Sequence, residues 1–510
     1  MSFAQIFTRS VVGLTAPQVL VEVHLSQGLP ALTIVGLPEA AVRESKDRVR
    51  SAMLNSGFEF PNRRLTINLA PADLPKEGAR LDLPISIGIL AASGQIDESV
   101  LAGFEFIGEL SLNGELRAVT GSLAVARAIK TTAKADALPR ALIVPLENAA
   151  EAAKVSGVTV LGAKTLADVC RHLDAVSGAK SGMGAFHEKD FLPVFEAVET
   201  KEEAVYPLDL ADVKGQHHAR RALEIAAAGG HSLLFKGVPG SGKTLMASRL
   251  PSILPPLTDE EALAVASTYS VAGQAYDYGV RPFREVHHSI SSVALVGGGS
   301  RPKPGEITLA DKGVLFLDEM PEFDRKVLEV LRQPIESKRI TISRANSQVE
   351  FPAEFQLVAA MNPCPCGYHG DPSGRCSCKP EAVARYQDKL SGPLLDRIDL
   401  HITVPALPIE DLQNASRGES SSVVRERVIK ARDIALKRQG KPNSELSVSE
   451  LDVHAVLGEA EKTLLSAAQK RLNLSARSYH RILRVARTVA DLAGSEHIST
   501  AHLAESLSYR

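Results

Sequence analysis

The sequence predicts an α/β protein of three folded parts, in which a central nucleotide-binding core lies between a mixed N-terminal domain and an all-helical C-terminal domain. Residues 1–178 alternate strand-like and helix-like segments, which is typical of an independent α/β or α+β domain. A short apolar run at residues 233–237 leads directly into a complete phosphate-binding motif. Residues 406–510 carry apolar side chains at three- and four-residue spacing, as amphipathic helices do.

The bulk composition excludes several classes of protein. The chain has 510 residues, which is too long for one hydrophobic core, and it carries 58 basic and 60 acidic side chains. This balance creates no overall field that attracts nucleic acid or a membrane, so any DNA contact must come from local basic clusters. The sequence has no apolar run of about 18 residues and no signal-peptide pattern at its start. We therefore expect a cytoplasmic protein with no membrane partner.

The N-terminal domain is expected to span residues 1–178, and it contains no nucleotide-binding motif. Its β-branched, alternating stretches predict strands, and its longer apolar stretches predict helices. The expected strands are residues 18–25, 32–35 and 65–69, and the expected helices are residues 40–55 and 83–92. Residues 179–205, rich in small and then in charged side chains, are expected to form a linker.

The central core is expected to span residues 206–405 and begins with the pattern GxxxxGK[ST] in a strand–loop–helix setting. Its glycines let successive backbone N–H groups curl around phosphate oxygens. Lys243 would reach the β- and γ-phosphates of a nucleotide, and the hydroxyl of Thr244 would bind Mg²⁺. The expected nucleotide-binding residues are Gly237, Val238, Pro239, Gly240, Ser241, Gly242, Lys243 and Thr244.

A second nucleotide element follows at residues 313–319, where an apolar run ends in Asp-Glu. Such a run suits a buried parallel strand, whose carboxyl end would lie beside the phosphate-binding loop. Asp318 would then bind Mg²⁺, mainly through water, and Glu319 would orient and polarise the attacking water. The two elements together predict one site for ATP and Mg²⁺.

Further segments of the core and the C-terminal part resemble those of AAA+ ATPases. Asn362, at the end of an apolar strand, is similar to the sensor-1 residue, which touches the γ-phosphate or the water. Arg397, in the segment Leu-Leu-Asp-Arg-Ile-Asp, is similar to the arginine finger of minichromosome-maintenance helicases and magnesium-chelatase ATPases. The alternative for Arg397 is a surface ion pair with Asp396 or Asp399. Arg477 is similar to the sensor-2 residue, which contacts ATP of its own subunit or of a neighbour.

The helical C-terminal part, residues 406–510, is expected to be the lid of the ATPase. The apolar spacing predicts helices at residues 425–438, 451–471 and 478–493. The arginines that follow Arg477 in the last of these helices are expected on its solvated face: Arg481, Arg484 and Arg487.

Two basic insertions in the core are similar to those of AAA+ proteins with a helix-2 insert. A glycine-rich loop, residues 287–305, contains Arg301 and Lys303. A predicted hairpin at residues 339–351 carries Arg344 near its turn and resembles the pre-sensor-1 hairpin. These three cations could bind DNA phosphates in the channel of a ring, and the alternative is ordinary surface charge.

Four of the five cysteines lie in a loop rich in Pro, Gly and Asp directly after Asn362. They form two C-x-C pairs, Cys364 with Cys366 and Cys376 with Cys378, which could place four thiolates around one Zn²⁺. This spacing is tighter than the usual C-x-x-C. Reduced cysteines without a metal and a regulatory disulfide are the alternatives.

The N-terminal domain itself resembles the catalytic domain of Lon protease, in residues 71–82 and 108–121. In that family the first stretch carries the serine nucleophile, but none of residues 77–83 is Ser, and Arg80 lies at or near its position. The partner lysine would follow Gly121, where the chain reads Ser-Leu-Ala. A Ser–Lys mechanism needs both groups, so we expect a domain without peptidase activity.

Together these features resemble the YifB/ComM family of magnesium-chelatase-like AAA+ ATPases, over nearly the whole chain. The resemblance implies a hexameric helicase that acts on single-stranded or branched DNA, drives branch migration, and helps incoming strands to integrate during natural transformation. One alternative is a magnesium-chelatase motor, which lacks the fused Lon-like domain. Another is a protein-remodelling ATPase or protease, which would need a peptidase dyad or an aromatic pore loop.

Overall fold

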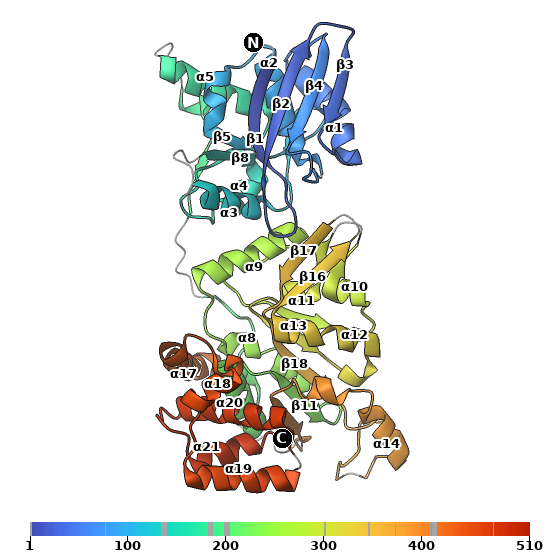
Figure 1. Cartoon of the computed structure of the whole chain (residues 1–510), viewed down its shortest axis with the longest axis vertical. Helices are drawn as coiled ribbons and strands as arrows, with labels where there is room; N and C mark the ends of the chain where they lie inside the picture. The colour runs from blue at the N-terminus through green and yellow to red at the C-terminus, as the bar shows by residue number, and fades with distance from the viewer. Residues whose placement is uncertain are drawn as a thin grey trace. The chain divides into compact units, whose positions relative to one another are not determined.

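The computed structural model of the 510-residue chain divides into two compact units. The first comprises Met1–Glu202 and Leu263–Tyr276, and the second comprises Glu203–Ala262 and Asp277–Arg510 (Figure 1). The structure describes residues 3–76, 78–133, 140–181, 187–197, 204–299, 302–344, 347–372, 374–408, 410, 416–472 and 474–510.

The first unit is built on a mixed eight-stranded sheet with the strand order β10-β9-β8-β5-β1-β2-β4-β3 (Figure 1). Its strands are β1 (Phe3–Arg9), β2 (Gln18–Ser26), β3 (Ala31–Val35), β4 (Arg64–Ala70), β5 (Phe104–Phe106), β8 (Ala141–Pro145), β9 (Val160–Ala163) and β10 (Val194–Phe195). The pairs β1–β2 and β2–β4 are antiparallel, whereas the chain from β1 through β5 and β8 to β9 is parallel. The strands predicted at residues 18–25, 32–35 and 65–69 are confirmed.

Helices pack against this sheet, and a short hairpin of β6 (Glu109–Leu110) and β7 (Leu116–Arg117) lies beside them. The helices are α1 (Ala40–Asn55), α2 (Asp82–Ala92), α3 (Ser122–Ala133), α4 (Leu146–Ala152) and α5 (Leu166–Ser181). All residues of α2 are buried, which explains its apolar run without a polar side. The helices predicted at residues 40–55 and 83–92 are therefore confirmed.

The segment that resembles the Lon nucleophile region has a structural ion pair of its own. Arg80 lies in the 3-10 helix η1 (Ala79–Leu81), directly before α2. The buried carboxylate of Asp82 accepts hydrogen bonds from Nε and Nη2 of Arg48, at 2.8 and 3.1 Å. This pair joins α1 to the start of α2. The lack of peptidase activity, and the likeness to Lon, stay predictions.

The second unit contains a parallel five-stranded sheet with the order β12-β15-β18-β11-β19. Its strands are β12 (Phe283–Val286), β15 (Val314–Leu317), β18 (Gln356–Met361), β11 (Leu233–Gly237) and β19 (Leu400–Val404). The helices of this core include α6 (His217–Gly229), α7 (Lys243–Ala247), α8 (Leu250–Ile253), α12 (Arg325–Val330), α13 (Arg332–Ser337), α14 (Pro380–Gln387) and α15 (Gly392–Leu395). Helix α9 (Asp259–Ala272) begins in this unit, and its residues from Leu263 onward belong to the first unit. The predicted α/β core is thus confirmed, and ligand chemistry in such sheets gathers at the carboxyl ends of the strands.

Both insertions form small two-stranded elements. The hairpin β16 (Arg339–Arg344) and β17 (Ser347–Pro352) is antiparallel and confirms the predicted hairpin. The glycine-rich insertion folds as α10 (Ser292–Val296), β13 (Gly297–Gly298), β14 (Lys303–Pro304) and α11 (Glu306–Leu309). A Cβ atom on Gly297 would lie 3.2 Å from Cδ1 of Ile342, so the insertion packs against the hairpin.

The C-terminal part is helical, as predicted (Figure 1, red). Its helices are α17 (Ser421–Gln439), α18 (Val448–His454), α19 (Glu459–Leu472), α20 (Ala476–Leu492) and α21 (Thr500–Leu507). The single helix predicted at residues 451–471 is wrong, because α18 ends at His454 and α19 begins at Glu459. Gly458, a weak helix former, lies in the break, which the apolar spacing alone did not reveal.

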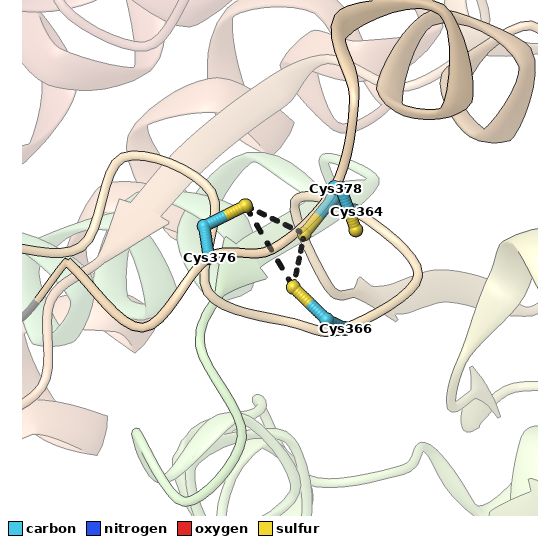
Figure 2. A group of neighbouring side chains, drawn as sticks. All are labelled: Cys364, Cys366, Cys376 and Cys378. Carbon is cyan, nitrogen blue, oxygen red and sulfur yellow. Dashed lines mark hydrogen bonds between the residues drawn. The ribbon is translucent and has the colours of Figure 1, made fainter.

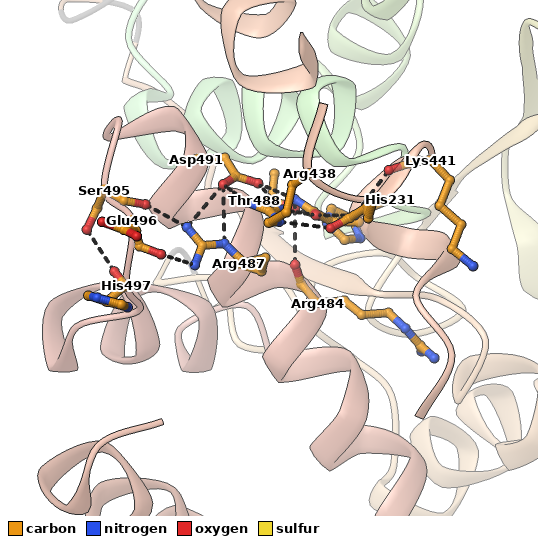
Figure 3. Close-up of polar contacts among 12 residues, drawn as sticks. His231, Arg438, Lys441, Arg484, Arg487, Thr488, Asp491, Ser495, Glu496 and His497 are labelled. Carbon is orange, nitrogen blue, oxygen red and sulfur yellow. Dashed lines mark hydrogen bonds and ion pairs between the residues drawn. The ribbon is translucent and has the colours of Figure 1, made fainter. Parts of the chain in front are cut away.

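Buried charge holds these helices together (Figure 3). The carboxylate of Asp491 accepts hydrogen bonds from both Nη1 and Nη2 of Arg438, at 2.7 and 2.9 Å, and from Nη2 of Arg487, at 3.0 Å. The side chain of Arg487 is only 3% exposed, so its expected place on a solvated face is wrong. Nε of Arg484 likewise donates a hydrogen bond to the backbone oxygen of Leu446. Both arginines are covered because α20 packs against α6, α17, α18 and α21.

Replacing the shared acceptor should destabilise this helical part. The substitution Asp491→Ala leaves the buried guanidinium group of Arg487 and the partly buried one of Arg438 without their carboxylate, so we expect the free energy of unfolding to fall by about 3–5 kcal/mol. Urea denaturation followed by circular dichroism measures the loss. Glu459→Ala is the control, because the exposed pair of Glu459 with Lys462 should contribute nothing measurable. Equal midpoints for the two variants would contradict this role of Asp491.

Candidate active site

The carboxyl ends of three neighbouring strands bring the predicted nucleotide residues together. β15, β18 and β11 are adjacent in the sheet, and they lead into Asp318, Asn362 and the phosphate-binding loop, respectively. Nζ of Lys243 donates a hydrogen bond to Oδ1 of Asn362 at 3.2 Å. The hydroxyl of Thr244 donates to Oδ2 of Asp318 at 2.7 Å. These contacts join segments that lie 119 and 74 residues apart in the sequence.

The conformation of the phosphate-binding loop requires its glycines. Gly240 and Gly242 have φ angles of 77° and 89°, a region that strongly favours glycine. At Gly237, a Cβ atom would lie 2.4 Å from the backbone oxygen of Val404 on the neighbouring strand β19. No side chain fits at this last position, so the pattern of glycines in the motif follows from local geometry.

Lys243 lies in the mouth of the loop and is mostly buried. Its Nζ donates to the backbone oxygens of Gly237 and Val238, at 2.9 and 3.0 Å, in addition to Asn362. Burial lowers the pKa of this ammonium group, and the nearby carboxylates of Asp318 and Glu319 partly offset the effect. A phosphate group would replace the backbone oxygens as the partner of Nζ, and its negative charge would favour the charged lysine.

The carboxylates of Asp318 and Glu319, which follow β15, differ in their contacts and exposure. Oδ1 of Asp318 accepts the backbone N–H of Glu319 at 2.8 Å, which together with the Thr244 contact fixes the aspartate beside the loop. Glu319 has a φ angle of 51°, and its side chain is 52% exposed. The hydroxyl of Thr244 and the carboxylate of Asp318 could therefore hold Mg²⁺, while Glu319 can reach a water molecule.

A histidine that the sequence analysis missed lies beside Glu319. Nδ1 of His288 is 3.8 Å from Oε2 of Glu319, and both residues line a cavity of about 360 Å³. The register Val286↔Leu317 between β12 and β15 brings the residues after the two strands together. β12 is only four residues long and contains Arg284 and Glu285, so its position in the sheet left no recognisable signal in the sequence.

Arg397 and Arg477 lie at the edge of the sheet where the strands begin, opposite the edge that carries the phosphate-binding loop. Arg397 precedes β19, whose first residue, Leu400, pairs with the first residue of β11. β11 spans five residues, so the two edges are about 13 Å apart at 3.3 Å per residue. Arg397 and the exposed Arg477 line one cavity of about 630 Å³ at this edge. The structure thus does not bring them to the phosphate-binding loop of the same chain.

Arg397 forms an ion pair with a residue other than Asp396 or Asp399. Its Nη2 atom lies 2.6 Å from Oε1 of Glu336, and its Nη1 atom donates to the backbone oxygen of Pro393. The side chain is 8% exposed. The expected alternative, an exposed pair with Asp396 or Asp399, is therefore wrong in both partner and exposure.

Asp399 instead lies where the sheet contacts the helical lid. Its carboxylate lies 3.4 Å from Nδ1 of His231. Nε2 of His231 is in turn 2.8 Å from the hydroxyl of Thr488 in α20 (Figure 3). Burial acts to raise the pKa of Asp399, but the contacts with His231 and Arg481 outweigh it and lower this pKa to about 2. The carboxylate is therefore charged, and it ties the strand-start edge to α20.

The residues predicted to bind DNA lie in the two insertions. Lys303, at the start of β14, is exposed. Arg344 ends β16 at the turn of the hairpin, where it pairs in register with Ser347. Arg301 lies outside the described residues. Lys303 and the backbone of Arg344 thus belong to elements that pack together through Gly297 and Ile342.

The four clustered cysteines converge in the loop after β18 (Figure 2). The Sγ atoms of Cys364 and Cys366 are 3.3 Å apart, and that of Cys376 lies 3.9 and 3.7 Å from them. With Cys378, all four sulfur atoms lie within 4.8 Å of one another. These distances far exceed an S–S bond of about 2.05 Å, so the cysteines are free thiols in a group that could hold a metal.

The fold and this site define a P-loop ATPase of the AAA+ class. Comparison with known families extends this conclusion over the whole chain. The family described as "Magnesium chelatase, subunit ChlI" matches residues 209–412, its C-terminal family matches residues 418–510, and "Subunit ChlI of Mg-chelatase" matches residues 21–148. The chain therefore belongs to the magnesium-chelatase-like family that includes ComM and YifB, as the sequence analysis predicted, and this membership implies ATP hydrolysis with Mg²⁺.

Two relatives are similar over the whole of this chain and nearly all of their own length, and a third is similar over part of both. Competence protein ComM of Haemophilus influenzae is 51% identical over 519 residues, covering 100% of this chain and 98% of that protein. YifB of Salmonella typhimurium is 46% identical over 514 residues, covering 100% and 97%. Magnesium-chelatase subunit ChlI of Cyanophora paradoxa is 24% identical over 187 residues, covering 32% of this chain and 48% of the relative. In the part of the chain that the structure describes, no helix has the length and apolarity to span a membrane.

Removing the lysine of the loop should abolish nucleotide binding. Lys243→Ala deletes the only side chain of the loop that donates to Asn362, and with it the cation for the phosphates. We expect affinity for ATP to fall at least about 100-fold, or about 2.7 kcal/mol, as measured with a fluorescent ATP analogue. Lys326→Ala, at an exposed position of α12, is the control. Near-normal binding by Lys243→Ala would contradict the assignment.

Proposed function

We propose that this protein is an ATP-driven DNA motor of the cytoplasm, which works as a hexamer and drives branch migration when single-stranded DNA integrates into a chromosome. The separation of Arg397 from the Lys243–Asp318–Asn362 site carries the proposal. An arginine that stabilises the transition state of phosphoryl transfer must reach the γ-phosphate. In one chain Arg397 lies at the wrong edge of the sheet for this, so a second copy must supply it.

Such an arrangement requires a head-to-tail interface. If the strand-start edge of one copy faces the carboxyl-end edge of the next, Arg397 and Arg477 both meet the neighbour's nucleotide, which assigns Arg477 to the neighbour's ATP as well. A heterologous interface of this kind closes into a ring when the rotation fits. Nε of Arg397 is buried and has no hydrogen-bond partner among the described residues, and an incoming phosphate could satisfy the guanidinium group.

DNA is the proposed substrate because of the insertions and the relatives. Lys303 and Arg344, with Arg301, would contact phosphates through charge alone, without reading the base sequence. A relative at 51% identity is called a competence protein, which supports a role in natural transformation. The similarity to a DNA replication licensing factor of Xenopus tropicalis, 23% over 214 residues, is consistent with a DNA motor.

A magnesium-chelatase motor is the second candidate, because all three matching families carry the name of its subunit. Such a motor would act on partner subunits that insert Mg²⁺ into a porphyrin. The two candidates share the ATP site and differ in what stimulates it. A structural Zn²⁺ at the cysteine cluster is part of the proposal in either case, since four convergent thiols suit that ion.

DNA should stimulate ATP hydrolysis by this protein. Steady-state rates are measured without nucleic acid, with single-stranded DNA, and with a branched three-strand substrate whose strand displacement is followed on a gel. Glu319→Gln, which keeps the nucleotide site but loses the base-like carboxylate, is the blank. A rate indifferent to both DNA substrates, with no displacement, would refute the DNA motor and favour the chelatase candidate.

Arg397→Ala should bind ATP normally but hydrolyse it slowly. The loss of an arginine finger lowers kcat about 10³-fold or more. Glu336→Gln is the matched variant, because it removes the ion-pair partner of Arg397 but leaves the guanidinium group in place. We expect this variant to keep its kcat. If kcat fell equally in the two variants, Arg397 would act only through its structural ion pair with Glu336. That result would contradict its role as an arginine finger.

A further inference from the structure

We propose that a Zn²⁺ ion held by Cys364, Cys366, Cys376 and Cys378 positions Asn362 and the phosphate-binding loop, and so sets the affinity of this protein for ATP. The inference rests on the proposed ATPase site, but it needs neither DNA nor a ring. It concerns what the metal does for the reaction, beyond holding a loop together.

The sulfur positions fit a single tetrahedral metal ion. Zn–S bonds of about 2.3 Å in a regular tetrahedron place the sulfurs about 3.8 Å apart. The three separations among the sulfur atoms of Cys364, Cys366 and Cys376 are 3.3, 3.7 and 3.9 Å, close to that value. Four soft ligands select Zn²⁺ over Mg²⁺ or Ca²⁺, and sulfurs this close leave no room for an iron–sulfur cluster between them.

Such an ion would supply most of the order in its loop. Between the end of β18 at Met361 and the start of α14 at Pro380, the described residues form turns but no helix or strand. The backbone oxygen of Pro363 accepts a hydrogen bond from Nε2 of Gln387 in α14 at 3.0 Å. A metal ion that joins Cys364 and Cys366 to Cys376 and Cys378 closes the loop on itself, and this stabilises one conformation.

The ligand-bearing turn touches the ATP site directly. The backbone N–H of Gly367 donates to the oxygen of Cys364 at 3.0 Å, and Gly367 has a φ angle of 87°. A Cβ atom on Gly367 would lie 2.6 Å from Cγ of Pro239 and 4.0 Å from Cγ of Asn362. At Gly367 the turn thus packs against Pro239 of the phosphate-binding loop and lies close to Asn362.

Asn362 is connected to the metal site through the chain as well. Only Pro363 separates Asn362 from Cys364, which is fully buried. The side chain of Asn362 accepts the hydrogen bond from Lys243. Movement of Cys364 must therefore move the side chain that contacts Lys243. Without the metal, the turn loses its anchor, and Pro239 and Asn362 lose the surface that supports them.

The metal content of the full chain tests the site itself. Elemental analysis of the purified protein should find about one zinc per chain. Cys376→Ser and Cys378→Ser should each lose most of it, because serine is a poor ligand for a soft site. Cys170→Ala, which removes a buried lone cysteine of the first unit, should keep it. A protein without bound metal, or cysteine variants with full zinc content, would overturn the proposal.

Nucleotide binding tests the connection. Zinc is removed from the wild-type protein with a zinc-selective chelator in the presence of excess Mg²⁺ and without DNA, and binding of a fluorescent ATP analogue is titrated. We expect affinity to fall about tenfold, which is about 1.4 kcal/mol, and to return on addition of ZnCl₂. Unchanged affinity after complete loss of zinc would overturn the connection. Because no DNA is present, this result is independent of whether the protein is a DNA motor.

A matched pair of glycine variants tests the contact route. Gly367 and Gly370 lie in the same loop and both have positive φ angles, 87° and 79°. An added methyl group collides with Pro239 at the first position and meets nothing within 4 Å at the second. Gly367→Ala should keep its zinc but bind ATP more weakly than Gly370→Ala, at similar thermal unfolding midpoints. Equal ATP affinities would exclude the contact of Gly367 with Pro239 as the route.

Discussion

The parallel pairing of β15, β18 and β11 is the constraint on which the rest of this protein depends. Because the three strands run in one direction, the side chains that follow them meet at one edge, although they come from positions 243, 318 and 362. The hydrogen bonds from Lys243 to Asn362 and from Thr244 to Asp318 are the direct result. The same pairing puts the residues that precede the strands at the opposite edge. The sheet therefore has a phosphate edge and an arginine edge, and in the proposed function one copy uses only the first for its own nucleotide.

The other parts of the second unit act on one edge or the other. The cysteine loop packs on Pro239 at the phosphate edge, where it supports the site. The lid helices attach at the arginine edge, where His231 connects Thr488 of α20 to Asp399. The buried carboxylate of Asp491 joins α17 to α20 through Arg438.

Much of the nucleotide site could be predicted from the sequence, because its residues stand in short contiguous motifs whose chemistry is local. The adjacency of Asp318, Asn362 and the loop followed from the rule that parallel strands share an edge. The proximity of His288 to Glu319 could not be predicted, since it depends on which strand flanks β15. The burial of Arg487 was missed for a similar reason: helical spacing shows a polar side but not the neighbouring helix that covers it. The ion pair of Arg397 with Glu336 likewise depends on tertiary packing alone.

The central claim is that one catalytic site needs two copies of this chain, and mixing two inactive variants tests it most directly. Lys243→Ala keeps the arginine edge intact, and Arg397→Ala keeps the phosphate edge intact. In a mixed ring, each Arg397→Ala copy whose phosphate edge faces a Lys243→Ala copy has a complete site. We predict that ATPase activity, close to background in either variant alone, rises when the two are mixed and is largest near equal amounts. Activity that stays at the sum of the separate variants in assembled mixed rings would contradict the account.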